Sequence, residues 1–388
     1  MPASTPDAAI RPTAVVAVPV RNEAERIRAC LAAIDAQVGL GPGSLGLVVF
    51  LNNCTDGTDA IVADLVPGLS IPVRVIAEDF SGAHAGWARR RAMDAASAWL
   101  GEGRGAILST DADTRVPPDW VARNLAALAA GADAVAGRVE LDPEEAALLP
   151  PALHARGRLE DAYDALITEA EARIDPDPHD PWPCHRTTIG ATLGVTRAAY
   201  VQVGGMPEIA LGEDGAFVAQ LFAHGLRVRH ATDVCVTVSA RLVGRAPGGV
   251  ADTIRSRCEE PDALCDARME TFPRAVLRYL WRARFRRLHG SGGLQADLAW
   301  ARRLGITAAE AQRIAALPLG QAIGEAERAS PRLGYRPIGP RSLPGQIRLA
   351  RAGLAAIRIL DRLGAVSRMS ARRVPPAPGV VDAGGGRA

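Results

Sequence analysis

The sequence contains no lysine, so all 45 of its Lys and Arg positions are arginines. Any phosphate clamp or general base in this protein must therefore use another side chain. The six cysteines are scattered and form no Cys-x-x-Cys pair, which favours reduced thiols over a disulfide framework or a zinc site. No run of about 18 apolar residues occurs, so we predict no membrane-spanning helix. The polar residues after Met1 do not resemble a signal peptide, and the expected location is the cytoplasm.

The net charge is only +2, which gives no indication of a nucleic-acid partner. A glycine-rich dinucleotide fingerprint and a P-loop are both missing after the first predicted strand, which argues against an NAD-dependent enzyme or a kinase. With 388 residues and 48% hydrophobic residues, the chain is long enough for one large α/β domain with an appendage.

Apolar runs alternate with segments of helical spacing in the first part of the chain. Strands are predicted at 13–20, 47–51, 73–77, 106–109 and 132–137, of which the first, second and fourth are expected to be buried. This alternation predicts an α/β fold with a mainly parallel, doubly wound sheet. We expect a flexible leader at 1–12, a main domain at 13–248, a helical C-terminal extension at 249–371 and a disordered tail at 372–388.

Polar clusters follow three of the predicted strands, at 19–23, 52–58 and 109–113. Ligands of such sheets bind beyond the carboxyl ends of the strands, so these clusters predict a single site. Asp111 and Asp113 are its most informative members, because two carboxylates at one strand end repel each other unless a cation neutralises them. Mg²⁺ or Mn²⁺ would do so and would also bind diphosphate oxygens. The pair therefore indicates a site for a metal-bound nucleotide diphosphate.

Six motifs, in this order along the chain, resemble those of family 2 glycosyltransferases, over roughly residues 13–240. They are Val18-Pro-Val-Arg-Asn22-Glu, Asn52-Asn-Cys-Thr-Asp56-Gly-Thr, Gly86-Trp-Ala-Arg89-Arg, Thr110-Asp111-Ala-Asp113, Gly204-Gly205 and Leu211-Gly212-Glu213-Asp214. The resemblance implies the GT-A fold, which is the nucleotide-diphospho-sugar transferase-like fold. It also implies transfer of a sugar from a nucleotide-diphosphate sugar to a hydroxyl acceptor. The acceptor class stays open between a glycan, a lipid-linked molecule and a small molecule.

For the donor, the resemblance implies that Pro19, Asn22 and Glu23 line the nucleotide pocket. Asn52 stands near the place where the family usually has a base-binding aspartate. An amide both donates and accepts hydrogen bonds, so this departure leaves uracil and guanine both open.

The resemblance also assigns charged groups around the diphosphate. Asp113, with Asp111 directly or through water, would hold Mn²⁺ or Mg²⁺. Arg89 or Arg90 would offset phosphate charge, the alternative being a solvated helix face. His230 is a candidate third metal ligand, as in some GT-A enzymes, although a lone histidine after a strand is more often structural.

Glu213 and Asp214 correspond to the family's acidic pair near the acceptor. Attack by a hydroxyl needs a general base, and a carboxylate in a partly desolvated cleft serves this role. We expect an inverting displacement with Asp214 as the base and Glu213 as the alternative. Capping of the following helix is the plain structural alternative for both acids. A retaining mechanism, which needs no such base, also stays open.

Two other classes remain as alternatives. A sugar nucleotidyltransferase would share the sheet and the metal but usually carries a glycine-rich, lysine-containing loop after the first strand, which is missing here. A non-catalytic sugar-binding scaffold would have no need of Asp111, Asp113 and Asp214.

The segment 274–287 predicts a basic amphipathic helix, with six arginines and no acid. It suggests peripheral contact with the inner face of a membrane, against the alternative of a helix packed on the main domain with its arginines outward.

Overall fold

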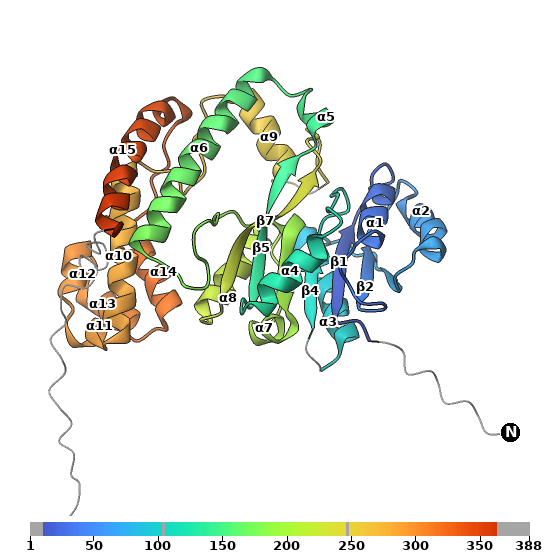
Figure 1. Ribbon diagram of the computed structural model, residues 1–388, viewed down its shortest axis with the longest axis horizontal. Coiled ribbons are helices and arrows are strands. Elements are labelled where there is room, and N and C mark those ends of the chain that lie inside the picture. The colour runs from blue at the N-terminus through green and yellow to red at the C-terminus, as the bar shows by residue number, and fades with distance from the viewer. Residues whose placement is uncertain (1–10, 103–104, 246–247, 363–388) are drawn as a thin grey trace, which may run out of the picture.

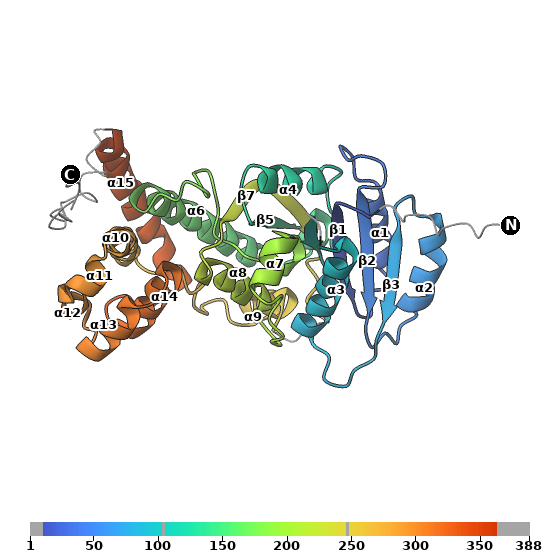
Figure 2. The same ribbon diagram turned by 90° about the horizontal axis from the view of Figure 1, so that it is seen from below.

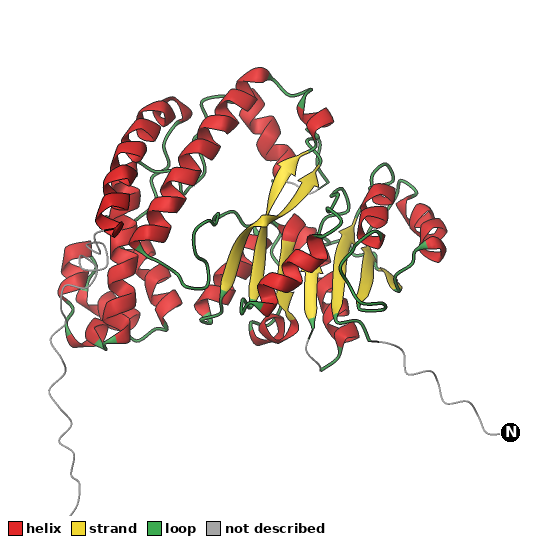
Figure 3. Ribbon diagram, viewed as in Figure 1, coloured by secondary structure: helices red, strands yellow, loops and turns green. Residues whose placement is uncertain are grey.

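The computed structural model describes residues 11–102, 105–245 and 248–362. In this part of the chain, seven strands form one sheet with the order β3-β2-β1-β4-β6-β5-β7 (Figures 1 and 3). The strands are β1 (Ala14–Val20), β2 (Leu45–Leu51), β3 (Val73–Ala77), β4 (Ala106–Ser109), β5 (Ala134–Leu141), β6 (Leu193–Thr196) and β7 (Val228–Val238). Most of the predicted leader and all of the predicted tail at 372–388 lie outside the described residues.

Most neighbouring strands of the sheet are parallel. β1 lies between β2 and β4 and is parallel to both, β2 is parallel to β3, and β5 is parallel to β7. β6 runs antiparallel to both of its neighbours, β4 and β5. The predicted α/β fold with a mainly parallel sheet is confirmed. The direction of β6 was not predicted, because the short sequence Leu193-Gly-Val-Thr196 carries no information about which way the strand pairs.

Helices cover both faces of the sheet (Figure 2). One face is covered by α1 (Ile27–Asp35), α2 (Thr58–Leu65) and α4 (Trp120–Ala129), and the other by α3 (Ala85–Leu100), α7 (Arg197–Gln202) and α8 (Glu213–Ala223). In β1, Val16 and Val18 pack on the first set, whereas Val15 and Ala17 pack on the second. A strand buried on both sides needs a continuous apolar sequence, which explains why these runs could be recognised.

The chain after β7 is mostly helical, as predicted. Its helices are α9 (Val250–Glu259), α10 (Phe272–Gly290), α11 (Gly293–Ala296), α12 (Ala299–Leu304), α13 (Ala308–Ala315), α14 (Leu319–Ala329) and α15 (Leu343–Arg362). Short turns of helix complete the structure at α5 (Pro143–Ala146), η1 (Val66–Gly68), η2 (Gly190–Thr192) and η3 (Pro340–Ser342). A close contact joins this layer to the sheet domain, because a Cβ on Gly320 of α14 would lie 2.2 Å from the backbone oxygen of Phe222.

The long helix α6 (Pro151–Ile174) leaves the sheet between β5 and β6. It packs on α10 and α15 (Figure 1), and its Tyr163 and Ile167 share an apolar cluster with Phe272 and Leu343. Although its residues fall inside the range predicted for the main domain, α6 is thus part of the helical layer by its packing.

The predicted basic helix at 274–287 is α10, but several of its arginines are paired inside the protein. Arg278 is 2% exposed and donates to Glu270 at 2.7 Å. Arg282 donates to Glu327 at 2.6 Å, and Arg286 donates to an aspartate at the end of α6. This pairing favours a helix packed on the protein with several arginines directed to acids, and contact of the helix with a membrane stays a prediction. No helix in the described ranges has the length and apolar character needed to cross a membrane.

Candidate active site

A buried arginine joins the acids expected at the carboxyl edge of the sheet. Arg89 of α3 donates from Nη2 to Asp111 Oδ1 at 2.9 Å and from Nε to Glu213 Oε1 at 3.1 Å. Its Nη1 donates to Ser109 Oγ and to the backbone oxygen of Gly190, each at 2.9 Å. The side chain is almost inaccessible, with 5% of Arg89 exposed. One guanidinium thus holds the acid after β4 and the acid that begins α8 in fixed positions.

The two candidate phosphate-binding arginines both have protein partners. Arg89 uses Nε, Nη1 and Nη2 on protein acceptors, so the alternative of a solvated helix face does not apply to it. Arg90 points elsewhere: its Nη1 donates to the backbone oxygen of Met206 at 2.9 Å, and its Nε lies 3.3 Å from Glu208. Arg89 therefore holds Asp111 and Glu213 in position, whereas Arg90 lies outside this acidic cluster.

Asp214 is the more accessible member of the acidic pair on α8. Its Oδ2 accepts a hydrogen bond from the backbone of Gly190 at 2.9 Å, and the carboxylate is only half-buried. Glu213 is 6% exposed and is held by Arg89. Both acids lie in the first turn of α8, so they also interact favourably with the helix dipole. Of the two, Asp214 has the access that a general base requires.

Asp113 is paired with an arginine that the sequence analysis missed. Arg241 Nη2 lies 3.0 Å from Asp113 Oδ2, and the same guanidinium grips Glu23 with contacts of 2.6 and 2.8 Å. Burial raises the pKa of the Asp113 carboxyl to about 6; the charge of Asp111 adds to the rise and Arg241 opposes it. Arg241 follows the last strand of the sheet closely, so recognising β7 in the sequence would have brought this arginine to the same edge.

Asp111 and Asp113 fit a divalent ion whose coordination is completed by other ligands. Among the residues that the structure describes, no group of three or more His, Cys, Asp and Glu side chains is arranged to hold a metal on its own. Mg²⁺, however, is commonly bound through one or two carboxylates together with water and substrate phosphates. Asp111 and Asp113 supply two such carboxylates at one end of a strand and therefore suit that pattern.

His230 is not brought to this acidic pair. It lies on β7, which is separated from β4 by β6 and β5. Its Nδ1 is 2.8 Å from Asp180 Oδ2, and its ring packs edge-on against His185 with 5.5 Å between the ring centroids. The structure therefore gives His230 a place in a buried polar cluster instead of a place beside Asp111 and Asp113.

This cluster predicts a loss of stability in mild acid. Burial lowers the pKa of His185 to about 4, and the neighbouring His230 adds to the effect. An unfolded histidine has a pKa near 6.5, so the unfolded chain takes up the proton first and stability falls as the pH drops from about 6.5 to 4. We expect a loss of roughly 3 kcal/mol over this range. Urea unfolding of the wild type and of His185→Gln at several pH values measures it, and equal slopes for the two proteins would contradict the assignment.

The nucleotide-binding candidates gather at the same edge as Asp111. Pro19 lies near the end of β1 and is half-buried. The side-chain oxygen of Asn22 accepts from the backbone of Thr55 at 2.7 Å, and the backbone of Glu23 donates to a threonine hydroxyl at the start of α2. Asn52 directly follows β2 and is 3% exposed. The loops after β1 and β2 are thus tied together beside the acidic pair.

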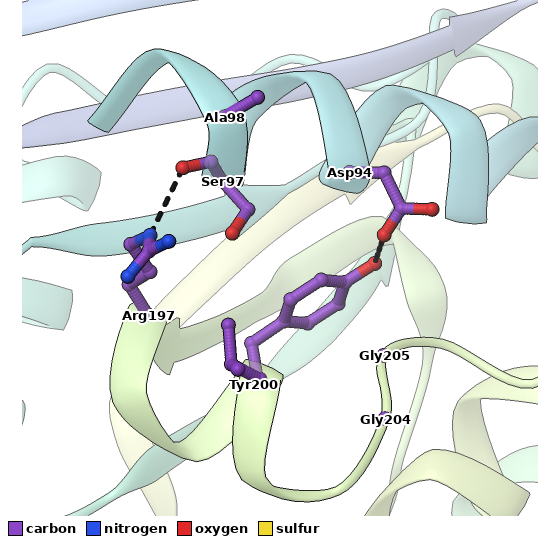
Figure 4. Close-up of a pocket in the computed structure, with 8 residues that line it drawn as sticks. Asp94, Ser97, Ala98, Arg197, Tyr200, Gly204 and Gly205 are labelled. Carbon is purple, nitrogen blue, oxygen red and sulfur yellow. Dashed lines mark hydrogen bonds between the residues drawn. The ribbon is translucent and has the colours of Figure 1, made fainter. Parts of the chain in front are cut away.

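The predicted Gly204-Gly205 turn has left-handed backbone at both residues, with φ of 80° and 84°. It borders a shallow recess of about 370 Å³ between α3 and α7 (Figure 4). Tyr200 donates to Asp94 at 2.7 Å across this recess. None of the predicted site residues lines it, so it is separate from the acidic cluster.

The fold and the acidic edge are those expected from the resemblance to GT-A glycosyltransferases. Residues 15–181 match the family model described as Glycosyl transferase family 2. The predicted resemblance, fold and enzyme class are thereby confirmed. The reaction class is the transfer of a sugar from a nucleotide-sugar donor.

Several solved structures are similar to this chain. The mannosyltransferase PcManGT from Pyrobaculum calidifontis, in complex with GDP-Man and Mn²⁺, is 20% identical, with a TM-score of 0.41 over 93% of this chain and 86% of that one. S. aureus TarS 1-349 in complex with UDP is 16% identical, with a TM-score of 0.44 over 91% and 92%. Glucosyl-3-phosphoglycerate synthase from Mycobacterium tuberculosis, in complex with Mn²⁺, UDP and phosphoglyceric acid, is 16% identical, with a TM-score of 0.38 over 70% and 77%. These superpositions are loose and carry no argument about substrate. No curated protein matches the chain.

Proposed function

We propose that the protein is a metal-dependent, inverting glycosyltransferase that uses Asp214 to deprotonate a hydroxyl acceptor. The observation that carries this proposal is one continuous network. Arg89 binds Asp111, Glu213 and the oxygen of Gly190, and Asp214 accepts from the nitrogen of the same glycine. The network supports a donor end and an acceptor end that are held in one rigid geometry.

On the donor side, Asp111 and Asp113 would hold Mn²⁺ or Mg²⁺. When bound, the ion neutralises charge on the departing diphosphate. Pro19, Asn22 and Glu23 line the pocket for the nucleotide in this proposal, and the amide of Asn52 contacts the base, with uracil and guanine both compatible.

On the acceptor side, Asp214 removes the hydroxyl proton as the oxygen attacks the anomeric carbon. The backbone nitrogens of Gly190 and Gly215 donate to Asp214 Oδ2 and Oδ1, at 2.9 and 2.7 Å, which orients the carboxylate. Each oxygen keeps a second lone pair that can accept the proton of the hydroxyl. Glu213 is committed to Arg89, so in this proposal it positions the arginine and does not exchange protons with the acceptor.

The proposed location is the cytoplasm. All six cysteines are unpaired in the structure, which fits a reducing compartment.

A thermal-shift titration with UDP, GDP, TDP and ADP, each with and without Mn²⁺, tests the donor site. We expect one nucleotide to raise the melting temperature only when Mn²⁺ is present, because a ligand at 100 times its Kd stabilises the folded state by about 2.7 kcal/mol. The shift should vanish in Asp113→Ala. It should persist in Asp119→Ala, which removes an exposed carboxylate paired with Arg123. No shift with any nucleotide would overturn the proposed function.

A further inference from the structure

Three carboxylates crowd together where the donor diphosphate is proposed to bind. Asp111 and Asp113 follow β4, and Glu23 follows β1, the neighbouring strand. Glu23 is 5% exposed, and the side chain of Asp113 is 18% exposed. Buried negative charges at such proximity need positive charge nearby.

Arg241 supplies positive charge to two of these acids at once. It grips Glu23 through both Nη atoms, at 2.6 and 2.8 Å, and the Nη2 atom also lies 3.0 Å from Asp113. A divalent ion bound to Asp113 would lie beside this guanidinium and be repelled by it. The guanidinium and the ion therefore compete for the same carboxylate.

The backbone beneath Arg241 is anchored, so exchange of partners requires movement of the side chain alone. The backbone nitrogen of Ala240 and the hydroxyl of Ser239 both donate to Glu145, at 2.7 and 2.6 Å. A guanidinium released from Asp113 finds an equally suitable partner in a phosphate group, because its planar fork matches phosphate oxygens.

We propose that Arg241 forms an ion pair with Asp113 while no donor is bound. When a nucleoside diphosphate binds, Arg241 pairs with its phosphates instead, and a divalent ion then binds Asp113 in place of the guanidinium. This inference rests on the proposed function, since it requires Asp113 to hold the ion. The inference adds to the proposed function that the divalent ion and the nucleotide bind cooperatively. The divalent ion alone binds weakly, and Arg241 couples its binding to that of the diphosphate.

Mn²⁺ binding, followed through the electron paramagnetic resonance signal of the free ion, tests this coupling without any turnover. We expect Arg241→Met to bind Mn²⁺ about tenfold more tightly than the wild type when no nucleotide is present, because a competing positive charge is gone. The gain in Mn²⁺ affinity caused by adding a nucleoside diphosphate should shrink in this variant, since Arg241 no longer binds the phosphates.

Two further variants keep the test decisive. Arg241→Lys retains the charge but cannot bridge two carboxylates with one fork, so its Mn²⁺ affinity should fall between those of the wild type and Arg241→Met. If Arg241→Met is too unstable to purify, Arg241→Lys replaces it in the Mn²⁺-binding experiment. Arg255→Met is the matched control, because Arg255 contacts the backbone oxygen of Leu242 beside Arg241 and pairs with Asp252. It should bind Mn²⁺ like the wild type.

The outcomes separate this inference from the proposed function. If the wild type binds Mn²⁺ with a nucleotide but Arg241→Met leaves the nucleotide-free affinity unchanged, Arg241 does not compete with the ion and the inference is wrong. If the wild type binds no Mn²⁺ with any of UDP, GDP, TDP or ADP, the proposed function itself fails.

Discussion

Replacement of Asp214 by asparagine is expected to lower kcat by about 10²- to 10⁴-fold, the range that general-base catalysis contributes. The asparagine oxygen can still accept the hydrogen bond from Gly190, although its amide nitrogen cannot accept the one that Gly215 donates to Asp214. The amide cannot take up a proton, so the main effect is expected on the chemical step. Donor affinity, measured by the thermal shift with nucleotide and Mn²⁺, should stay near that of the wild type.

Glu213→Gln is the informative comparison for this experiment. Because Glu213 is bound by Arg89, its replacement should lower the stability of the protein and reduce kcat less than Asp214→Asn does. A larger loss of kcat in Glu213→Gln would reverse the two roles. If Asp214→Asn keeps most of its activity, the reaction does not use this base, and a retained anomeric configuration in the product would then identify a retaining mechanism.

Replacement of Arg89 by methionine is expected to destabilise the protein by about 3–5 kcal/mol, the usual effect of removing one partner from a buried ion pair. Glu213, with a side chain only 8% exposed, would lose its positive partner, and Ser109 and the oxygen of Gly190 would lose their donor. Activity should fall as well, because Asp111 and Glu213 would no longer be fixed. Urea unfolding together with kcat measures both effects.

Two comparisons show whether the ion pair itself is responsible. Arg91→Met removes an arginine from the same helix whose pair with Glu78 is exposed, and it should change stability by less than about 1 kcal/mol. The double variant Arg89→Met/Glu213→Gln should be less destabilised than the sum of its single variants, since the buried charge is removed with its partner. Strict additivity would show that Arg89 and Glu213 are not coupled.

Sequence patterns predicted the parts of this structure that depend on local periodicity. β3 and β4 lie where their apolar runs were recognised, and the polar clusters after β1, β2 and β4 lie at one edge of the sheet, as expected from the rule for parallel sheets. The function of Arg89 could not be predicted in the same way. From the sequence alone, an arginine in a helix is expected to be exposed to solvent. Only the tertiary structure shows that Arg89 is surrounded by Asp111, Glu213 and Gly190.

The contributions of Arg241 and α6 were missed for a related reason. Both act on residues far away in the sequence: Arg241 reaches Glu23 and Asp113, and α6 packs on α10 and α15. Apolar spacing in α6 shows that it has a buried face but not which element covers that face. Charge composition likewise could not show that Arg278 and Arg282 of α10 pair with acids from other segments.

The packing of α6 has a consequence for how the chain acquires its structure during synthesis. The helix emerges from the ribosome before β6, which lies between β4 and β5, yet its apolar partners in α10 and α15 are made much later. Its face with Tyr163 and Ile167 stays uncovered while the sheet is being completed, and such exposed apolar surface favours aggregation. The helical layer therefore completes its folding only after α10 and α15 have been made, and a nascent chain released after β7 would still carry an unprotected helix.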